Sequence, residues 1–98
     1  MTLNKIPDGT KLTIEIIGRL DTTTAPQLDE EIAASIGGVK NLVLDFGQLE
    51  YISSAGLRVL LKSQKTMMKQ GKMVIVNASE TIREVFELTG FMDILTLG

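Results

Sequence analysis

The chain has 98 residues, of which 44% are hydrophobic, 4% aromatic and 22% charged, and its formal net charge is −2. That length fits one domain, residues 1–98, built around a single aliphatic core. The sequence contains neither cysteine nor histidine, which excludes disulfides, thiol or histidine catalysis and the usual zinc sites. The slightly acidic balance argues against nucleic acid as a partner.

The chain shows no signal for membrane insertion or export. No apolar run approaches the roughly 18 residues that a transmembrane helix needs. The first ten residues are polar and lack the apolar stretch of a signal peptide. We therefore expect a cytoplasmic protein that is not itself inserted into a membrane.

In the first half of the chain, the pattern predicts two paired strands, a helix and a third strand. Residues 12–16 alternate between apolar and polar side chains, and the turn signal at residues 7–9 lets residues 3–6 pair with them. A helix over residues 26–36 opens with proline and is followed by two glycines. The apolar run over residues 42–44 indicates a strand that is covered on both faces.

The second half of the chain alternates between helices and strands. It predicts a loop over residues 47–52, a helix over 54–70, a buried strand over 73–76, a helix over 79–90 and a last short strand over 94–96. The resulting order, β-β-α-β-α-β-α-β, places the chain in the α/β class. Such an order predicts a mainly parallel, mixed sheet with helices packed against it.

The helix over residues 54–70 carries two stripes. The apolar stripe, expected to face the core, consists of Leu57, Leu60, Leu61 and Met68. The basic stripe is either a solvated face or a surface for an acidic partner, and consists of Arg58, Lys62, Lys65 and Lys69. Met67, Met68 and Met73 are interpreted as core filler. Phe91 and Met92 fit either the core or an exposed patch.

Two loops are candidate functional sites, because sites in open α/β sheets lie where strands lead into helices. They are residues 18–24 and residues 51–57. In the second loop, Ser54 precedes small residues at the start of a helix. A phosphate on Ser54 would meet free backbone N–H groups there, and its roughly −2 charge would act on whatever docks at this surface.

Each of these residues also has a purely structural interpretation. A serine before a helix is more often an N-cap than a phosphorylation site. Gly56 could simply allow close packing of the helix on a strand. Asp21 could satisfy backbone donors in its turn, or it could shape and charge a surface beside Ser54.

Four segments together resemble the STAS family, which is named after sulphate transporters and anti-sigma factor antagonists. They are Ile-Gly-Arg-Leu-Asp at residues 17–21, Leu-Val-Leu-Asp-Phe at 42–46, Tyr-Ile-Ser-Ser-Ala-Gly-Leu at 51–57 and Val-Phe-Glu-Leu-Thr-Gly-Phe at 85–91. The resemblance covers essentially the whole chain. Two positions depart from the best-known pattern: Ser53 stands where aspartate is frequent, and Ala55 stands where serine or threonine is frequent.

The resemblance implies a phosphorylation switch without catalysis by this chain. In antagonist members, the unmodified protein binds an anti-sigma factor that is also a serine kinase, and so frees a sigma factor. The kinase phosphorylates the serine that corresponds to Ser54, the complex separates, and a phosphatase resets it. Ser53 is a second candidate acceptor. The expected partner-binding residues are Asp21, Thr22, Ser53, Ser54, Ala55, Gly56 and Arg58.

Two other hypotheses remain open. The chain could be a STAS docking subunit of a membrane lipid transporter, in which Ser54 is only a helix cap. It could also be an enzyme that uses Asp21, Asp45 or Glu50, although it lacks histidine, cysteine and a metal cluster. We expect no cofactor. The sequence leaves open the oligomeric state and the binding of nucleotide or lipid.

Overall fold

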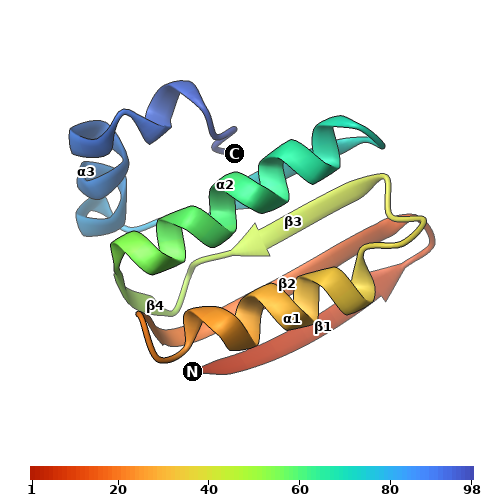
Figure 1. Ribbon diagram of the computed structural model, residues 1–98, viewed down its shortest axis with the longest axis horizontal. Helices are drawn as coiled ribbons and strands as arrows, with labels where there is room; N and C mark the ends of the chain where they lie inside the picture. The colour runs from red at the N-terminus through yellow and green to blue at the C-terminus, as the bar shows by residue number, and fades with distance from the viewer.

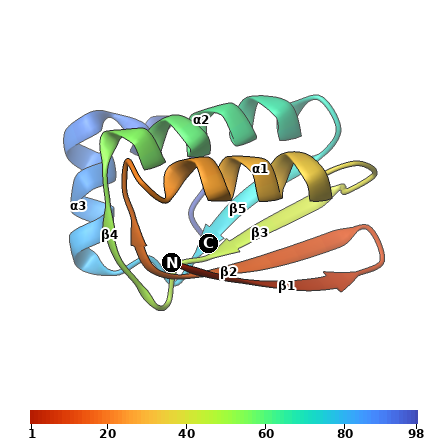
Figure 2. The same cartoon turned by 60° about the horizontal axis from the view of Figure 1, so that its bottom comes forward.

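The computed structural model describes all 98 residues as a mixed five-stranded sheet with α1 and α2 side by side on one face (Figures 1 and 2). Strands β1, β2, β3 and β5 lie in that order, and β4 pairs with β2 off this path. The elements are β1 Thr2–Asp8, β2 Lys11–Leu20, α1 Ala25–Ser35, β3 Asn41–Asp45, β4 Leu49–Ile52, α2 Ser54–Met68, β5 Lys72–Val76, α3 Glu80–Thr89 and the 3-10 helix η1 Phe91–Asp93.

Strand β2 organises the sheet because it pairs with three other strands. Strand β1 runs antiparallel to it, from Thr2 opposite Ile17 to Asp8 opposite Lys11. The first half of β2 pairs in parallel with β3, and its second half, after a register shift at Gly18, pairs in parallel with β4. The carboxyl ends of β2 and β4 therefore lie side by side, just before the loops that lead into α1 and α2.

A cluster of 23 buried hydrophobic residues joins the sheet to the helices. In α1, Leu28 and Ile32 are buried against the sheet, as the helical spacing predicts. Helix α3 lies across the end of the sheet (Figure 2) and buries Ile82 and Phe86. The ring of Phe86 lies 6.4 Å from that of Phe46, within the range of favourable aromatic pairs. The core is aliphatic apart from this pair, as the composition indicates.

The prediction that strands are covered on both faces was wrong. In β3, Leu42 and Leu44 are buried, whereas Val43 between them is only half-buried. Strand β5 alternates in the same way. The cause is the placement of α1 and α2 on a single face of the sheet (Figure 2). Residue 43 points to the other face, which neither of these helices covers.

Residues 47–52 do not form only a loop, as the sequence suggested. Leu49–Ile52 is strand β4. It has four residues with buried ends and an exposed middle, so it shows no alternation that a sequence pattern could detect. The strand exists because β2 extends beyond β3 and offers its second half for pairing.

The predicted last strand over residues 94–96 was also wrong. Residues 91–93 form η1, and the following segment contacts β5 through a single bridge between Leu97 and Ile75. Met67 and Met73 are buried as expected, but Met68 is 72% exposed because it lies on the outer side of α2. Phe91 and Met92 are partly buried and pack against the core. No helix has the length and apolar character needed to cross a membrane.

Candidate functional site

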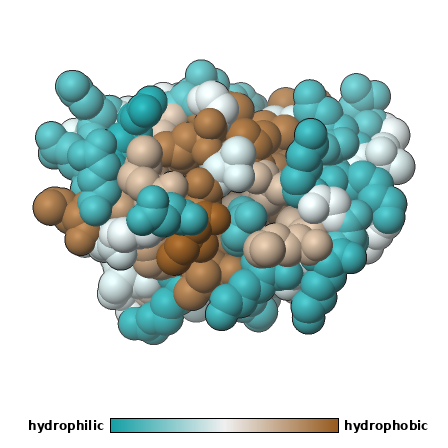
Figure 3. Space-filling model, turned by 90° about the horizontal axis from the view of Figure 1, so that it is seen from above, coloured by the Kyte–Doolittle hydropathy of each residue, from teal (hydrophilic) through white to brown (hydrophobic).

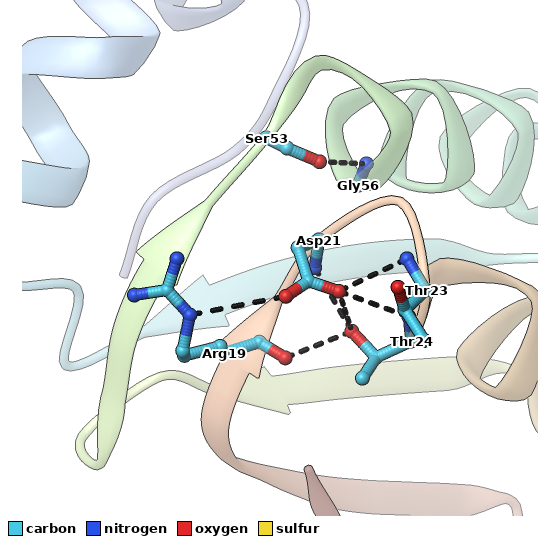
Figure 4. Close-up of polar contacts among 6 residues, drawn as sticks. All are labelled: Arg19, Asp21, Thr23, Thr24, Ser53 and Gly56. Atoms are coloured by element: carbon cyan, nitrogen blue, oxygen red, sulfur yellow. Dashed lines mark hydrogen bonds and ion pairs between the residues drawn. The ribbon is translucent and has the colours of Figure 1, made fainter.

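The two loops singled out by the sequence lie next to each other at one end of the molecule. The loop before α1 follows β2, and the start of α2 follows β4. The backbone N–H of Ser53 donates to the carbonyl of Leu20 at 2.9 Å, so the start of α2 is tied directly to the end of β2. Figure 4 shows Asp21 and Ser53 on adjacent segments.

Ser53, not Ser54, is the N-cap of α2. Its backbone is extended (φ −99°, ψ 175°), and its hydroxyl accepts a hydrogen bond from the N–H of Gly56 at 3.4 Å. Ser54 is the first residue of the helix, is exposed, and its hydroxyl makes no hydrogen bond within the chain. The interpretation of Ser54 as only a helix cap is therefore wrong. Its hydroxyl is free and faces solvent.

Gly56 allows α2 to approach the strands closely. A Cβ atom at this position would lie 2.7 Å from Cγ of Leu20 and 2.9 Å from Cγ1 of Ile52, both shorter than real contacts. Gly56 itself is buried. Its place in the site is structural, since it sets how far Ser54 stands from the end of β2, and this agrees with the close-packing interpretation.

Asp21 organises the turn before α1. Its Oδ1 accepts from the N–H groups of Thr23 and Thr24, at 3.0 and 3.1 Å, and from the hydroxyl of Thr24 at 3.2 Å (Figure 4). These bonds, the one from the Thr24 backbone foremost, hold the pKa of Asp21 below its usual value, and the nearby positive charge of Arg19 acts in the same direction. Asp21 is thus mainly a turn-forming residue at the border of the surface around Ser54.

The remaining predicted partner-binding residues differ in exposure. Thr22 is exposed in the turn, Ala55 is partly buried against the core, and Arg58 is exposed one turn of α2 beyond Ser54. The basic stripe of α2 is solvent-exposed along the helix. Within it, Lys62 pairs with Asp29 of α1 at 3.1 Å.

Two residues of the candidate loops, which no sequence pattern connects with each other, come into contact at this end. Arg19 of β2 and Tyr51 of β4 are register partners, and the guanidinium carbon of Arg19 lies 4.3 Å from the centre of the Tyr51 ring. A prediction that β4 pairs in parallel with β2 would have brought them together. Because residues 47–52 were predicted to be a loop, this pairing was missed. Both residues lie in segments that carry the family resemblance.

The residues considered for an enzyme hypothesis are engaged elsewhere or scattered. Oδ1 of Asp45 accepts from the N–H of Gly47 at 2.9 Å and from the side-chain amide of Asn77 at 3.1 Å. Glu50 is exposed at the middle of β4, and Asp21 is held in its turn. No group of three or more acidic, histidine or cysteine side chains is arranged to hold a metal ion.

Comparison with known proteins places this arrangement in a family. The model of the STAS domain matches residues 2–98. The chain belongs to the STAS domain family. The match extends over both loops of the site, so the resemblance carried by residues 17–21 and 51–57 is confirmed at the level of the family.

Relatives of this STAS domain are named as anti-sigma factor antagonists. BtrV of Bordetella bronchiseptica, whose name places it among them, is 42% identical over 100 residues, covering 100% of this chain and 84% of its own length. The anti-sigma-B factor antagonist of Listeria monocytogenes is 30% identical, covering 92% of this chain and 81% of its own.

Solved structures share the fold. An anti-sigma factor antagonist from Mycobacterium paratuberculosis superposes with a TM-score of 0.88 at 25% identity, covering 98% of this chain and 83% of its own. Unphosphorylated SpoIIAA superposes with a TM-score of 0.79 at 21% identity, covering 99% and 87%. The single α/β domain with a mixed sheet, expected from the sequence, is therefore confirmed.

Proposed function

We propose that this STAS domain is an anti-sigma factor antagonist whose binding is switched by phosphorylation of Ser54. Unphosphorylated, it binds an anti-sigma factor that is also a serine kinase, and phosphate on Ser54 ends the complex. A serine phosphatase restores the binding form. The chain supplies a substrate side chain and a docking surface in the cytoplasm and performs no catalysis of its own.

The observation that carries this proposal is the difference between the two adjacent serines. The hydroxyl of Ser53 is engaged with the N–H of Gly56, whereas that of Ser54 is exposed and unbonded. A kinase can reach the second hydroxyl without breaking a contact of the fold. Ser54 is therefore the first choice of acceptor, with Ser53 second.

The surroundings of Ser54 also suit a charge switch. The first turn of α2 contains no acidic residue, and its positive helix end is free to stabilise a phosphate. Phosphorylation adds about −1.5 to −2 charges. The fold tolerates this change, so its effect falls on the docked partner. The relatives named as antagonists and the existence of a phosphorylated form of SpoIIAA, which has a similar fold, support the proposal.

The test uses the purified anti-sigma factor kinase from the source organism with wild type, Ser54→Ala and Ser54→Asp. We expect Ser54→Ala to bind like wild type but to resist release by ATP, and Ser54→Asp to bind at least about tenfold more weakly, a loss of roughly 1.4 kcal/mol. Urea denaturation should show Ser54→Asp to be as stable as wild type or stabilised by about 0.3–1 kcal/mol, because the charge lies at a helix start.

Two control variants test whether the changes in kinase binding and release belong to Ser54. Ser79→Asp places the same charge at the start of α3 and should leave binding unchanged. Ser53→Ala should still be released by ATP if Ser54 is the acceptor. Release of Ser54→Ala by ATP would contradict the assignment of Ser54. Recovery of membrane-transport subunits equally by wild type and Ser54→Asp would favour a constitutive docking subunit instead.

A further inference from the structure

At the same end of the molecule as Ser54, the ends of β2 and β4 present an exposed arginine stacked on an exposed tyrosine. Arg19 and Tyr51 face each other across the parallel strand pair, with the guanidinium carbon 4.3 Å from the ring centre. The side chain of Arg19 is 58% exposed, and Tyr51 is 42% exposed. The stacking leaves both side chains at the surface while limiting the positions that either can take.

The guanidinium N–H groups of Arg19 have no hydrogen-bond acceptor within the chain. Its Nε lies 3.8 Å from Oδ2 of Asp21, which is an ion-pair contact but too long for a hydrogen bond. The side chain makes no hydrogen bond within the chain. The other oxygen of Asp21 accepts from the backbone N–H groups of Thr23 and Thr24. The Tyr51 ring and the Asp21 carboxylate thus restrict the position of the guanidinium. Its N–H groups remain available to an acceptor outside the chain.

This combination has the physical properties of a binding anchor. Arginine and tyrosine are among the residue types that most often dominate the energy of protein interfaces. A side chain that is already held in place loses less conformational freedom on binding, which favours affinity. The planar fork of a guanidinium matches the two oxygens of a carboxylate. Arg58, which is exposed near the start of α2, is also positively charged, so it too would attract an acidic partner.

We propose that Arg19 and Tyr51 anchor the partner of this STAS domain, and that the partner presents an aspartate or glutamate to Arg19 beside an apolar contact on the Tyr51 ring. The proposal rests on the function proposed above and adds the chemistry that selects the partner. It also explains the direction of the switch. A phosphate on Ser54 brings negative charge to the end of the molecule that receives the partner's carboxylate, and like charges repel.

The experiment measures, by isothermal titration calorimetry, binding of the purified anti-sigma factor kinase to wild type, Arg19→Gln, Arg19→Glu, Tyr51→Ala and Lys72→Glu. Lys72 is the matched control, because it is exposed at the first residue of β5, at the opposite end of the sheet. We expect Arg19→Glu to weaken binding at least about thirtyfold, the loss typical of a hot spot, and Tyr51→Ala about tenfold. Arg19→Gln should fall between wild type and Arg19→Glu, and Lys72→Glu within about twofold of wild type.

A second measurement tests the carboxylate itself. Aspartate and glutamate residues on the kinase surface are changed to lysine one at a time and titrated with Arg19→Glu. At least one should restore binding by tenfold or more to Arg19→Glu while weakening binding to wild type. The anchor is wrong if Arg19→Glu binds as tightly as Lys72→Glu, or if no charge exchange restores binding.

Failure of the anchor is distinguishable from failure of the proposed function. Suppose that wild type binds the kinase and is released by ATP through Ser54, and that Arg19→Glu behaves like wild type. Only the proposal for Arg19 and Tyr51 is then contradicted. If wild type does not bind the kinase at all, both proposals fall. Thermal melting of each variant, followed by circular dichroism, tests whether a loss of binding comes from a loss of fold. We expect every variant to remain folded, because the changed side chains are exposed.

Discussion

Helices α2 and α3 begin with the same kind of N-cap hydrogen bond but differ in the charge of their first turn. Each helix begins after a serine with an extended backbone whose hydroxyl accepts from an N–H three residues ahead. At α3 the bond that Ser79 accepts measures 3.2 Å, and Glu80 adds a negative charge in the first turn. At α2 the bond that Ser53 accepts measures 3.4 Å, and the first turn contains no acidic residue.

This difference separates a helix start whose dipole is already compensated by a negative charge from one whose dipole is not. Helix α3 carries its own negative charge at the positive end of its dipole, so an added phosphate there would be repelled by Glu80. Helix α2 leaves that end uncompensated, with only small side chains after Ser53. Of these two helix starts, that of α2 is therefore the one where added negative charge costs the fold less. It is also the place where the fold exposes a serine hydroxyl.

The largest expected effect tests whether the start of α2 is firmly packed despite being open on its outer side. Gly56→Ala should destabilise the protein by about 1–3 kcal/mol, because the new methyl group would overlap Leu20 and Ile52. Urea denaturation measures the change. Gly37→Ala is the control, since no atom lies within 4 Å of its added Cβ and its φ is not positive, and it should be nearly neutral. Equal stability of the two variants would mean that α2 can move away from the strands.

An intermediate effect sharpens the comparison of the two caps. Ser79→Ala should lower the free energy of unfolding by about 1 kcal/mol, the usual cost of a lost N-cap. Ser53→Ala should cost less, because its hydrogen bond is longer. Thermal and urea denaturation of both variants provide the measurement. A larger loss for Ser53→Ala would show that the cap of α2 matters more than its geometry indicates.

The smallest effect concerns the neighbouring turn and appears only in acid. The folded pKa of Asp21 lies below its unfolded value, so its contribution to stability is present above the unfolded value, near 3.9, and is lost as the pH falls through the folded pKa. Asp21→Asn should therefore lower the melting temperature slightly at pH 7 and reduce the further loss between pH 4 and pH 2. An unchanged acid dependence would show that the carboxylate charge does not stabilise the turn.

Sequence patterns predicted the parts of the fold in which local and global signals agree. Residues 12–16 alternate in a strand that is buried on one face, and the helix carrying Leu28 and Ile32 has the expected spacing. The patterns failed for β4 and for residues 94–96, because these segments are short and depend on what lies beside them. An apolar run such as residues 42–44 does not reveal whether one or both faces are covered.

Only part of the candidate site could be predicted from the sequence, because some of its features follow from local sequence and others from strand pairing. The position of Ser54 at a helix start follows from local sequence, and so do the glycine at 56 and the turn around Asp21. Which of two adjacent serines caps the helix depends on backbone geometry that neither residue type determines. The contact between Arg19 and Tyr51 depends on strand pairing between segments about 30 residues apart, which no local pattern encodes.

The division of β2 between two parallel neighbours has a consequence for how such proteins can diversify. Main-chain hydrogen bonds, which are indifferent to side-chain identity, fix the spacing between the two loops at the end of β2 and β4. The outward-pointing side chains on those strand ends can therefore be exchanged without redesigning the scaffold. On the proposal made above for Arg19 and Tyr51, a few substitutions at positions 19 and 51 would give duplicated copies of such a chain separate partners within one cell, and would keep signalling pathways that share this architecture insulated from one another.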